Sequence, residues 1–128
     1  MKSVSSDTRP TNRNVFQYRF PLTAIISILH RVSGVALFLA MPLFLCALSS
    51  SLASAEQFQS LQTTLQQIHI KFLVWVILAA LSFHWVAGVR HMIMDLGFAE
   101  SLRAGQMGAM LTLIFSIVLM VMAGVWLW

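Results

Sequence analysis

The stretch "FLVWVILAALSFHWVAGV", residues 72–89, decides the fold because it contains no Asp, Glu, Lys or Arg. Two further runs, 32–48 and 107–128, lack these charged residues as well. Each run is close to the ~20 residues that a helix needs to cross a bilayer. The chain of 128 residues is 59% hydrophobic and 9% charged, which is more apolar side chain than a soluble domain of this size can bury. The sequence therefore predicts an all-α membrane protein with three transmembrane helices, at about 22–49, 69–95 and 107–128.

The distribution of basic residues predicts the orientation of these helices. The formal net charge is +4, and most of the basic residues precede the first span or flank the connection after the second: Lys2, Arg9, Arg13, Arg19, Arg90 and Arg103. The connection at about 49–70 has no Arg. By the positive-inside rule, the N-terminus and the loop 91–106 are cytoplasmic. The basic residues therefore indicate topology and give no support for nucleic-acid binding.

The rest of the chain predicts a simple organisation. Residues 1–20 are polar and form a cytoplasmic N-terminal arm, and residues 21–128 form the three-helix transmembrane domain. The start of the chain does not have the pattern of a signal or transit peptide, so we expect an uncleaved multi-pass protein in a bacterial inner membrane. Cys46 is the only cysteine, which excludes an internal disulfide and a cysteine-ligated cluster.

The second span carries polar residues along one face. His84 lies six residues from Arg90, or ~9 Å deeper in the membrane. His84, Gly88, His91 and Asp95 follow the i, i+4, i+7, i+11 spacing of a single helix face. Gly88 has no side chain, so it leaves flat space beside the imidazole of His84 in which a planar group could lie.

The first span supplies a matching polar patch. Ser27 and Arg31 are an i, i+4 pair, and His30 lies three residues after the serine. Arg31 and Arg90 each border a charge-free run, so we expect them at similar depth, with His30 and His91 beside them. Together these residues predict a cationic or protonatable rim above the deeper His84.

A deep imidazole below a cationic rim is typical of a b-type haem site. Haem iron takes histidine as an axial ligand, and the two propionates need positive or hydrogen-bonding partners. A quinone head group also fits the rim, since its carbonyl oxygens accept hydrogen bonds from groups such as Ser27, His30 or Arg31. Simpler roles remain open at this point. His84 could hydrogen-bond a neighbouring helix, Arg31 and Arg90 could anchor the spans at the headgroups, and His91 with Asp95 could complement the helix dipole.

Two motifs resemble a known family. "RPTNRNVFQYRFPLTAIISILHRVSG" (residues 9–34) and "HWVAGVRHMIMDLG" (residues 84–97) are similar to the two signatures of the cytochrome b membrane-anchor subunit of succinate dehydrogenase. The motifs occur in the family's order, and the three-span layout covers the whole chain.

The resemblance implies a role within respiratory complex II. The family anchors the flavoprotein and iron–sulfur subunits at the membrane beside a second small anchor subunit, and electrons from succinate reach ubiquinone. It implies one haem b shared with the partner anchor, with His84 as an axial ligand to the iron. It also implies that His30, Arg31 and His91 lie near the haem propionates, and that Ser27 and Arg31 bind ubiquinone. The chain itself carries no residues for succinate oxidation.

Three alternatives remain at this stage. A self-contained cytochrome could ligate haem through His30 and His84 of one chain. A membrane scaffold could use its histidines only to satisfy one another. A fumarate reductase anchor would run the same electron path in the opposite direction. Because three helices offer few partners for these polar residues, the sequence favours membership of a larger heteromeric helix bundle.

Overall fold

The computed structural model of the chain describes residues 20–99 and 101–128, and this part is entirely helical. The four helices are α1 (Leu22–Ala53), α2 (Ala55–Leu65), α3 (Ile68–Asp95) and α4 (Leu102–Leu127). The predicted arm at 1–20 lies outside the described residues except for Phe20. Helices α1, α3 and α4 are long and apolar enough to cross a membrane. The prediction of three spans in an all-α protein is confirmed.

The helix ends follow from local chemistry. Pro21 is the N-cap of α1, where its missing N–H is not needed, and the serines Ser54 and Ser101 cap α2 and α4 with their side chains. Gly97 ends α3 with a φ of +83°, and its N–H and that of Phe98 bond back into the last turn. This left-handed position is one that glycine adopts without strain.

Two spans are longer than the hydropathy indicated. Helix α1 continues through Pro42 to Ala53 rather than ending near residue 49, and α4 begins at Leu102 rather than at 107. With 32 residues, α1 is ~48 Å long, which exceeds the ~30 Å thickness of the hydrocarbon core. This helix therefore tilts or extends beyond the apolar region.

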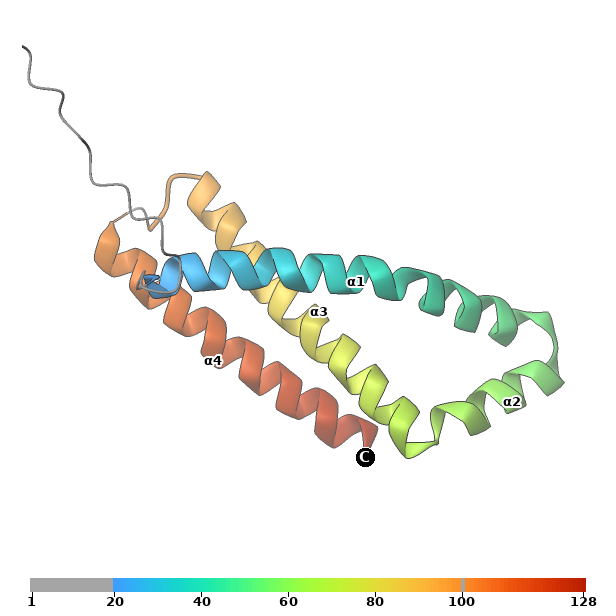
Figure 1. Cartoon of the computed structure of the whole chain (residues 1–128). Coiled ribbons are helices and arrows are strands. Elements are labelled where there is room, and N and C mark those ends of the chain that lie inside the picture. Colours follow the sequence, from blue (N-terminus) through green and yellow to red (C-terminus); the bar gives the residue numbers. More distant parts are fainter. Residues whose placement is uncertain (1–19, 100) are drawn as a thin grey trace, which may run out of the picture.

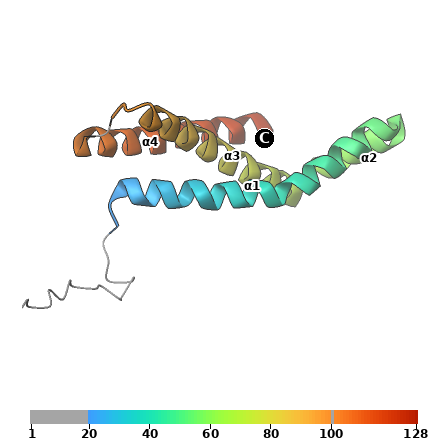
Figure 2. The ribbon, with the colours of Figure 1, turned by 90° about the horizontal axis from the view of Figure 1, so that it is seen from above.

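Helix α3 is central to the packing, because it contacts both α1 and α4 extensively. Helices α3 and α4 run antiparallel side by side, while α1 crosses α3 and then diverges toward α2 (Figure 1). Figure 2 shows α1 on one side of the α3–α4 pair. The start of α1, the end of α3 and the start of α4 share one end of the molecule, as the predicted topology requires.

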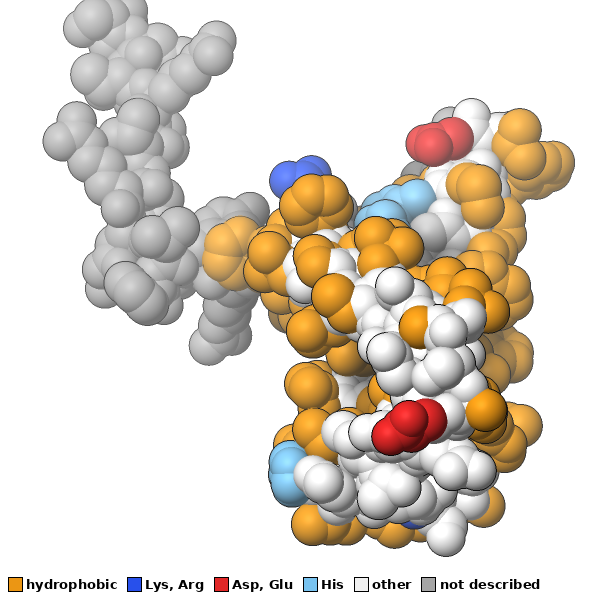
Figure 3. Space-filling view, turned by 90° about the vertical axis from the view of Figure 1, so that its right-hand side faces the viewer, with side chains coloured by type: hydrophobic (Ala, Val, Ile, Leu, Met, Phe, Trp, Pro, Cys, Tyr) orange, Lys and Arg blue, Asp and Glu red, His pale blue; other side chains and the backbone are white. Residues whose placement is uncertain are grey.

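A small core lies where these helices meet. It consists of Ile26 from α1, Phe83 and Ala87 from α3, and Ala109 from α4. Most other large apolar side chains are exposed, including Phe38 at 75% and Trp126 at 80%, and hydrophobic atoms cover much of the surface in Figure 3. An apolar surface of this extent is compatible with lipid or partner helices around it and incompatible with water.

Candidate functional site

Three histidines are in contact where α1 crosses α3. The rings of His30 and His84 are stacked, with centroids 4.2 Å apart and planes 16° apart. His91 lies on the other side, tilted by 48°, with its centroid 5.1 Å from that of His30. All three histidines are half-buried. The predicted grouping of these residues is present in the structure, with His30 between the other two.

The imidazole of His84 is held on α1 through its Nδ1 atom. This atom lies 3.1 Å from the backbone carbonyl oxygen of His30 and 3.1 Å from the hydroxyl oxygen of Ser33. The Ser33 hydroxyl donates a hydrogen bond of 2.8 Å to the same carbonyl. Within the described residues, the Nε2 atom of His84 makes no hydrogen bond. Nδ1 of the ring therefore bonds to α1, and Nε2 has no hydrogen-bond partner among the described residues.

Gly34 permits this close approach, and Gly88 lies at ordinary contact distance from the ring of His30. A Cβ added to Gly34 would lie 2.9 Å from Cε1 of His84, closer than real Cβ atoms come to a neighbour. A Cβ added to Gly88 would lie 3.4 Å from Nε2 of His30. The expectation of free flat space beside Gly88 is corrected here, because the imidazole of His30 occupies it. A side chain from the neighbouring helix fills a gap that the sequence of α3 alone left open.

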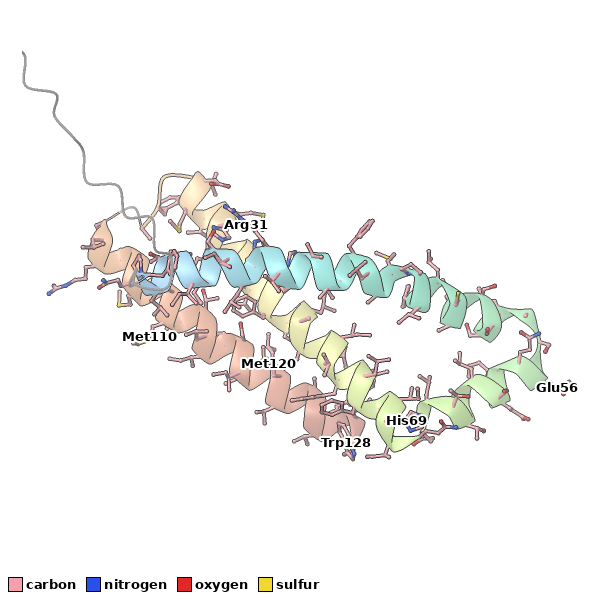
Figure 4. The ribbon with its side chains drawn as sticks, in the orientation of Figure 1. Arg31, Glu56, His69, Met110, Met120 and Trp128 are labelled. Atoms are coloured by element: carbon pink, nitrogen blue, oxygen red, sulfur yellow. The ribbon has the colours of Figure 1, made fainter. Side chains whose placement is uncertain are left out.

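Ser27 and Arg31 lie on α1 at the same end. Ser27 is half-buried and Arg31 is exposed, and Figure 4 shows Arg31 on the part of α1 that crosses α3. The two residues share one helix face as their spacing predicted. An exposed guanidinium one turn from a hydroxyl gives several hydrogen-bond donors for a ligand outside the chain.

Arg90 does not belong to the rim. Its side chain is 8% exposed, and one of its terminal nitrogens donates a hydrogen bond of 3.2 Å to the backbone oxygen of Gly105 on α4. Its Nε atom lies beside Gly108. The expectation that Arg90 is part of the cationic rim is therefore wrong, because its side chain points into the α3–α4 interface. In the described residues, His91 and Asp95 form no ion pair.

Comparison with known proteins identifies the chain. Residues 5–123 match the model of the family described as "Succinate dehydrogenase/Fumarate reductase transmembrane subunit". The chain belongs to this family. It is 46% identical over 121 residues to the succinate dehydrogenase cytochrome b556 subunit of Coxiella burnetii, covering 94% of this chain and 97% of the relative. The protein of the same name from Paracoccus denitrificans is 29% identical over 126 residues, covering 95% and 94%.

Membership of this family confirms the resemblance that the two motifs indicated, and it bears on the histidine cluster. In the described ranges, the structure has no group of three or more His, Cys, Asp or Glu side chains that could hold a bare metal ion. A porphyrin, which supplies four nitrogens itself, needs only axial ligands from protein.

Two residues within the first motif (9–34) also shape this site. Ser33 and Gly34 contact His84 directly, although neither had a predicted role. One signal was present, because Ser33 follows His30 by three residues and so lies near it on the α1 surface. Which α3 residue it meets depends on the crossing of the helices, which spacing along one helix does not specify.

Proposed function

We propose that the chain is the haem b-binding anchor subunit of succinate dehydrogenase, which holds the flavoprotein and iron–sulfur subunits on the membrane and forms part of the ubiquinone reduction site. Family membership over most of the chain, with relatives named cytochrome b556 subunits, supports the assignment. The observation that carries it is the His84 imidazole, fixed through Nδ1 and free at Nε2 inside a membrane span. An ionisable residue at such depth is a functional residue by default.

His84 fits the role of axial haem ligand. Metal-bound histidines usually donate the N–H of one ring nitrogen to a backbone carbonyl while the other nitrogen binds the metal, and His84 has this arrangement toward His30. Stacking of His30 covers a face of the ring, whereas the lone pair of Nε2 lies in the ring plane, which the stacked ring does not cover. When bound, haem b supplies one-electron transfer through its iron.

The polar groups around His84 fit the propionates. Arg31 carries a permanent positive charge, and His30 and His91 add donors at the same end of the helices. Charged hydrogen bonds of this kind are stronger than neutral ones. We assign these three residues to the propionate side of the haem.

A second protein ligand to the haem would come from a second small anchor subunit. Ligation of one haem by both His30 and His84 of this chain would require a porphyrin between the two rings. Because the rings are stacked face to face with centroids 4.2 Å apart, no porphyrin fits between them. The wide apolar surface of α1 beyond the crossing, including Val35, Phe38 and Leu39, fits helices of such a partner.

Ubiquinone binds at Ser27 and Arg31. The hydroxyl and the guanidinium donate hydrogen bonds to the quinone oxygens, and the positive charge stabilises negative charge that develops on the ring during reduction. The exposure of Arg31 leaves it open to this substrate. With the N-terminus cytoplasmic and named relatives from bacteria, the site lies at the cytoplasmic side of a bacterial inner membrane.

The test uses the whole membrane complex purified through a tag on this chain. Reduced-minus-oxidised spectra of wild type and His84→Ala report the haem, and loss or displacement of the b-type signal is the expected result. An unchanged signal would exclude His84 as the ligand. A wild-type preparation with neither a haem signal nor partner subunits would favour the alternative of a membrane scaffold without a cofactor.

The quinone site is tested separately with Arg31→Ala and Ser27→Ala. Both variants lose quinone reduction, while succinate still reduces an artificial dye and haem is retained. Arg103→Ala is the control, because Arg103 is an exposed arginine on α4. Normal quinone turnover in both variants would refute the assignment. Faster fumarate reduction than succinate oxidation in the wild type would favour the fumarate reductase alternative.

A further inference from the structure

Ser33 is a buried hydroxyl placed between two parts of the site. It is 9% exposed and comes from α1, where it lies within hydrogen-bond distance of the His30 carbonyl oxygen, at 2.8 Å, and of Nδ1 of His84, at 3.1 Å. The other side-chain hydroxyls of α1 and α3 with hydrogen bonds, Ser51 and Ser82, contact only a carbonyl in the preceding turn of their own helix. Ser33 is therefore the one among them that links two helices.

The direction of these hydrogen bonds follows from what each atom can do. A carbonyl oxygen only accepts, so the contact between His84 and the His30 carbonyl requires a hydrogen on Nδ1. The Ser33 hydroxyl gives its own hydrogen to that carbonyl and turns a lone pair toward Nδ1. The N–H of Nδ1 is thus shared between two oxygens, and both oxygens favour the same tautomer of His84.

We infer that Ser33 is a positioning residue for His84. Together with Gly34 it holds the imidazole against α1 with Nδ1 protonated, so that Nε2 keeps its lone pair for a ligand. This inference rests on the proposed role of His84 as haem ligand. Gly34 contributes space, since a side chain there would meet Cε1 of His84 at 2.9 Å. Ser33 contributes the second acceptor, which restrains rotation of the ring about the bond to the His30 carbonyl.

The contacts that Ser33 and Gly34 make with His84 would affect a bound haem iron through the basicity of this ligand. A hydrogen bond from the Nδ1–H of a metal-bound histidine increases electron donation by the other nitrogen, and loss of such a partner typically weakens metal binding by about 10–100-fold. Stronger donation favours ferric over ferrous iron. Removal of the Ser33 hydroxyl leaves only one acceptor for Nδ1–H, so the balance moves toward the ferrous form and the midpoint potential of the haem rises.

The experiment measures the haem midpoint potential in the purified complex for Ser33→Ala, Ser33→Thr and Ser82→Ala. A tenfold change in the ratio of ferric to ferrous stability is ~59 mV for one electron, which sets the scale expected for Ser33→Ala. Ser33→Thr keeps the hydroxyl and restores the wild-type potential. Ser82→Ala removes a half-buried hydroxyl from α3 that bonds only to Leu78, and it leaves the potential unchanged.

The outcomes separate this inference from the proposed function. Equal potentials and equal reduced spectra in Ser33→Ala, Ser82→Ala and wild type overturn the role of Ser33, even when His84→Ala removes the haem signal. If His84→Ala leaves the haem unchanged, the proposed ligand itself is wrong. Should Ser33→Ala fail to assemble, Ser33→Cys replaces the hydroxyl by a weak donor and acceptor, and the same comparison applies. Its unshifted potential would likewise overturn the inference.

Discussion

Replacement of Gly34 by alanine tests the contact between α1 and the His84 ring. The added Cβ would lie 2.9 Å from Cε1 of His84, whereas ordinary contact begins at 3.4 Å. The ring must therefore retreat by about 0.5 Å. Because Nδ1 is bonded to Cε1 in the same rigid ring, its two 3.1 Å contacts lengthen toward about 3.6 Å, which is beyond hydrogen-bond range.

The energetic cost follows from the same geometry. A buried donor that loses its acceptors destabilises the folded state by about 1–3 kcal/mol, and overpacking of a well-packed contact costs a similar amount. These two effects describe one displacement and are alternatives rather than a sum. We expect Gly34→Ala to destabilise the helix contact by about 1–3 kcal/mol and to alter the environment of the haem that we propose His84 to ligate.

The assay is a thermal melt of the purified complex, followed by haem absorbance and by release of subunits. Gly105→Ala is the matched control, because a Cβ at this buried glycine of α4 would meet Thr23 at 3.8 Å and the Ala99 backbone oxygen at 3.9 Å, both ordinary contacts. The control should melt like wild type, while Gly34→Ala melts earlier and shows a changed haem spectrum. Identical melting and spectra for both variants would refute the close approach of α1 to His84.

Three further substitutions probe other contacts. Gly97→Ala places a Cβ at a φ of +83° and should lower the free energy of unfolding by about 1–2 kcal/mol, measured as a shift in the thermal midpoint; an unshifted midpoint would contradict the left-handed cap. Trp75→Phe removes the indole N–H that donates to the Met120 oxygen at 3.1 Å, and a loss of about 1 kcal/mol should appear in the same melt. An unchanged melt would contradict this hydrogen bond between α3 and α4. Arg90→Leu should lower the free energy of unfolding by about 1.5–3 kcal/mol through loss of the hydrogen bond to Gly105, while quinone reduction persists. A selective loss of quinone reduction would instead indicate that Arg90 belongs to the cationic rim.

The sequence predicted the helices well because a membrane span depends on the hydropathy of about 20 consecutive residues, which is a local property of the sequence. Charge-free runs located all three spans, and the predicted end of the second span at residue 95 is where α3 ends. The extensions of α1 to Ala53 and of α4 back to Leu102 were missed, because helices continue beyond the hydrocarbon through polar residues that hydropathy does not count.

The histidine cluster was also accessible from the sequence, although its internal arrangement was not. Spacing on one helix placed His84 and His91 on a common face, and depth placed His30 near them. That His30 would stack on His84 at 4.2 Å and fill the space beside Gly88 depends on how two helices cross. No periodicity along one helix contains that information.

What the sequence by itself determined is the membrane location, the three spans, the family and the set of polar residues at one end. Only the tertiary structure decided that the Arg90 side chain packs against α4 and that His30 lies between His84 and His91. It also decided that Ser33 and Gly34 contact the imidazole of His84. The physical reason is that these spans are apolar on all sides, so hydrophobic periodicity does not fix their rotation about the helix axis. Close packing of small residues and a few interhelical hydrogen bonds set that rotation instead.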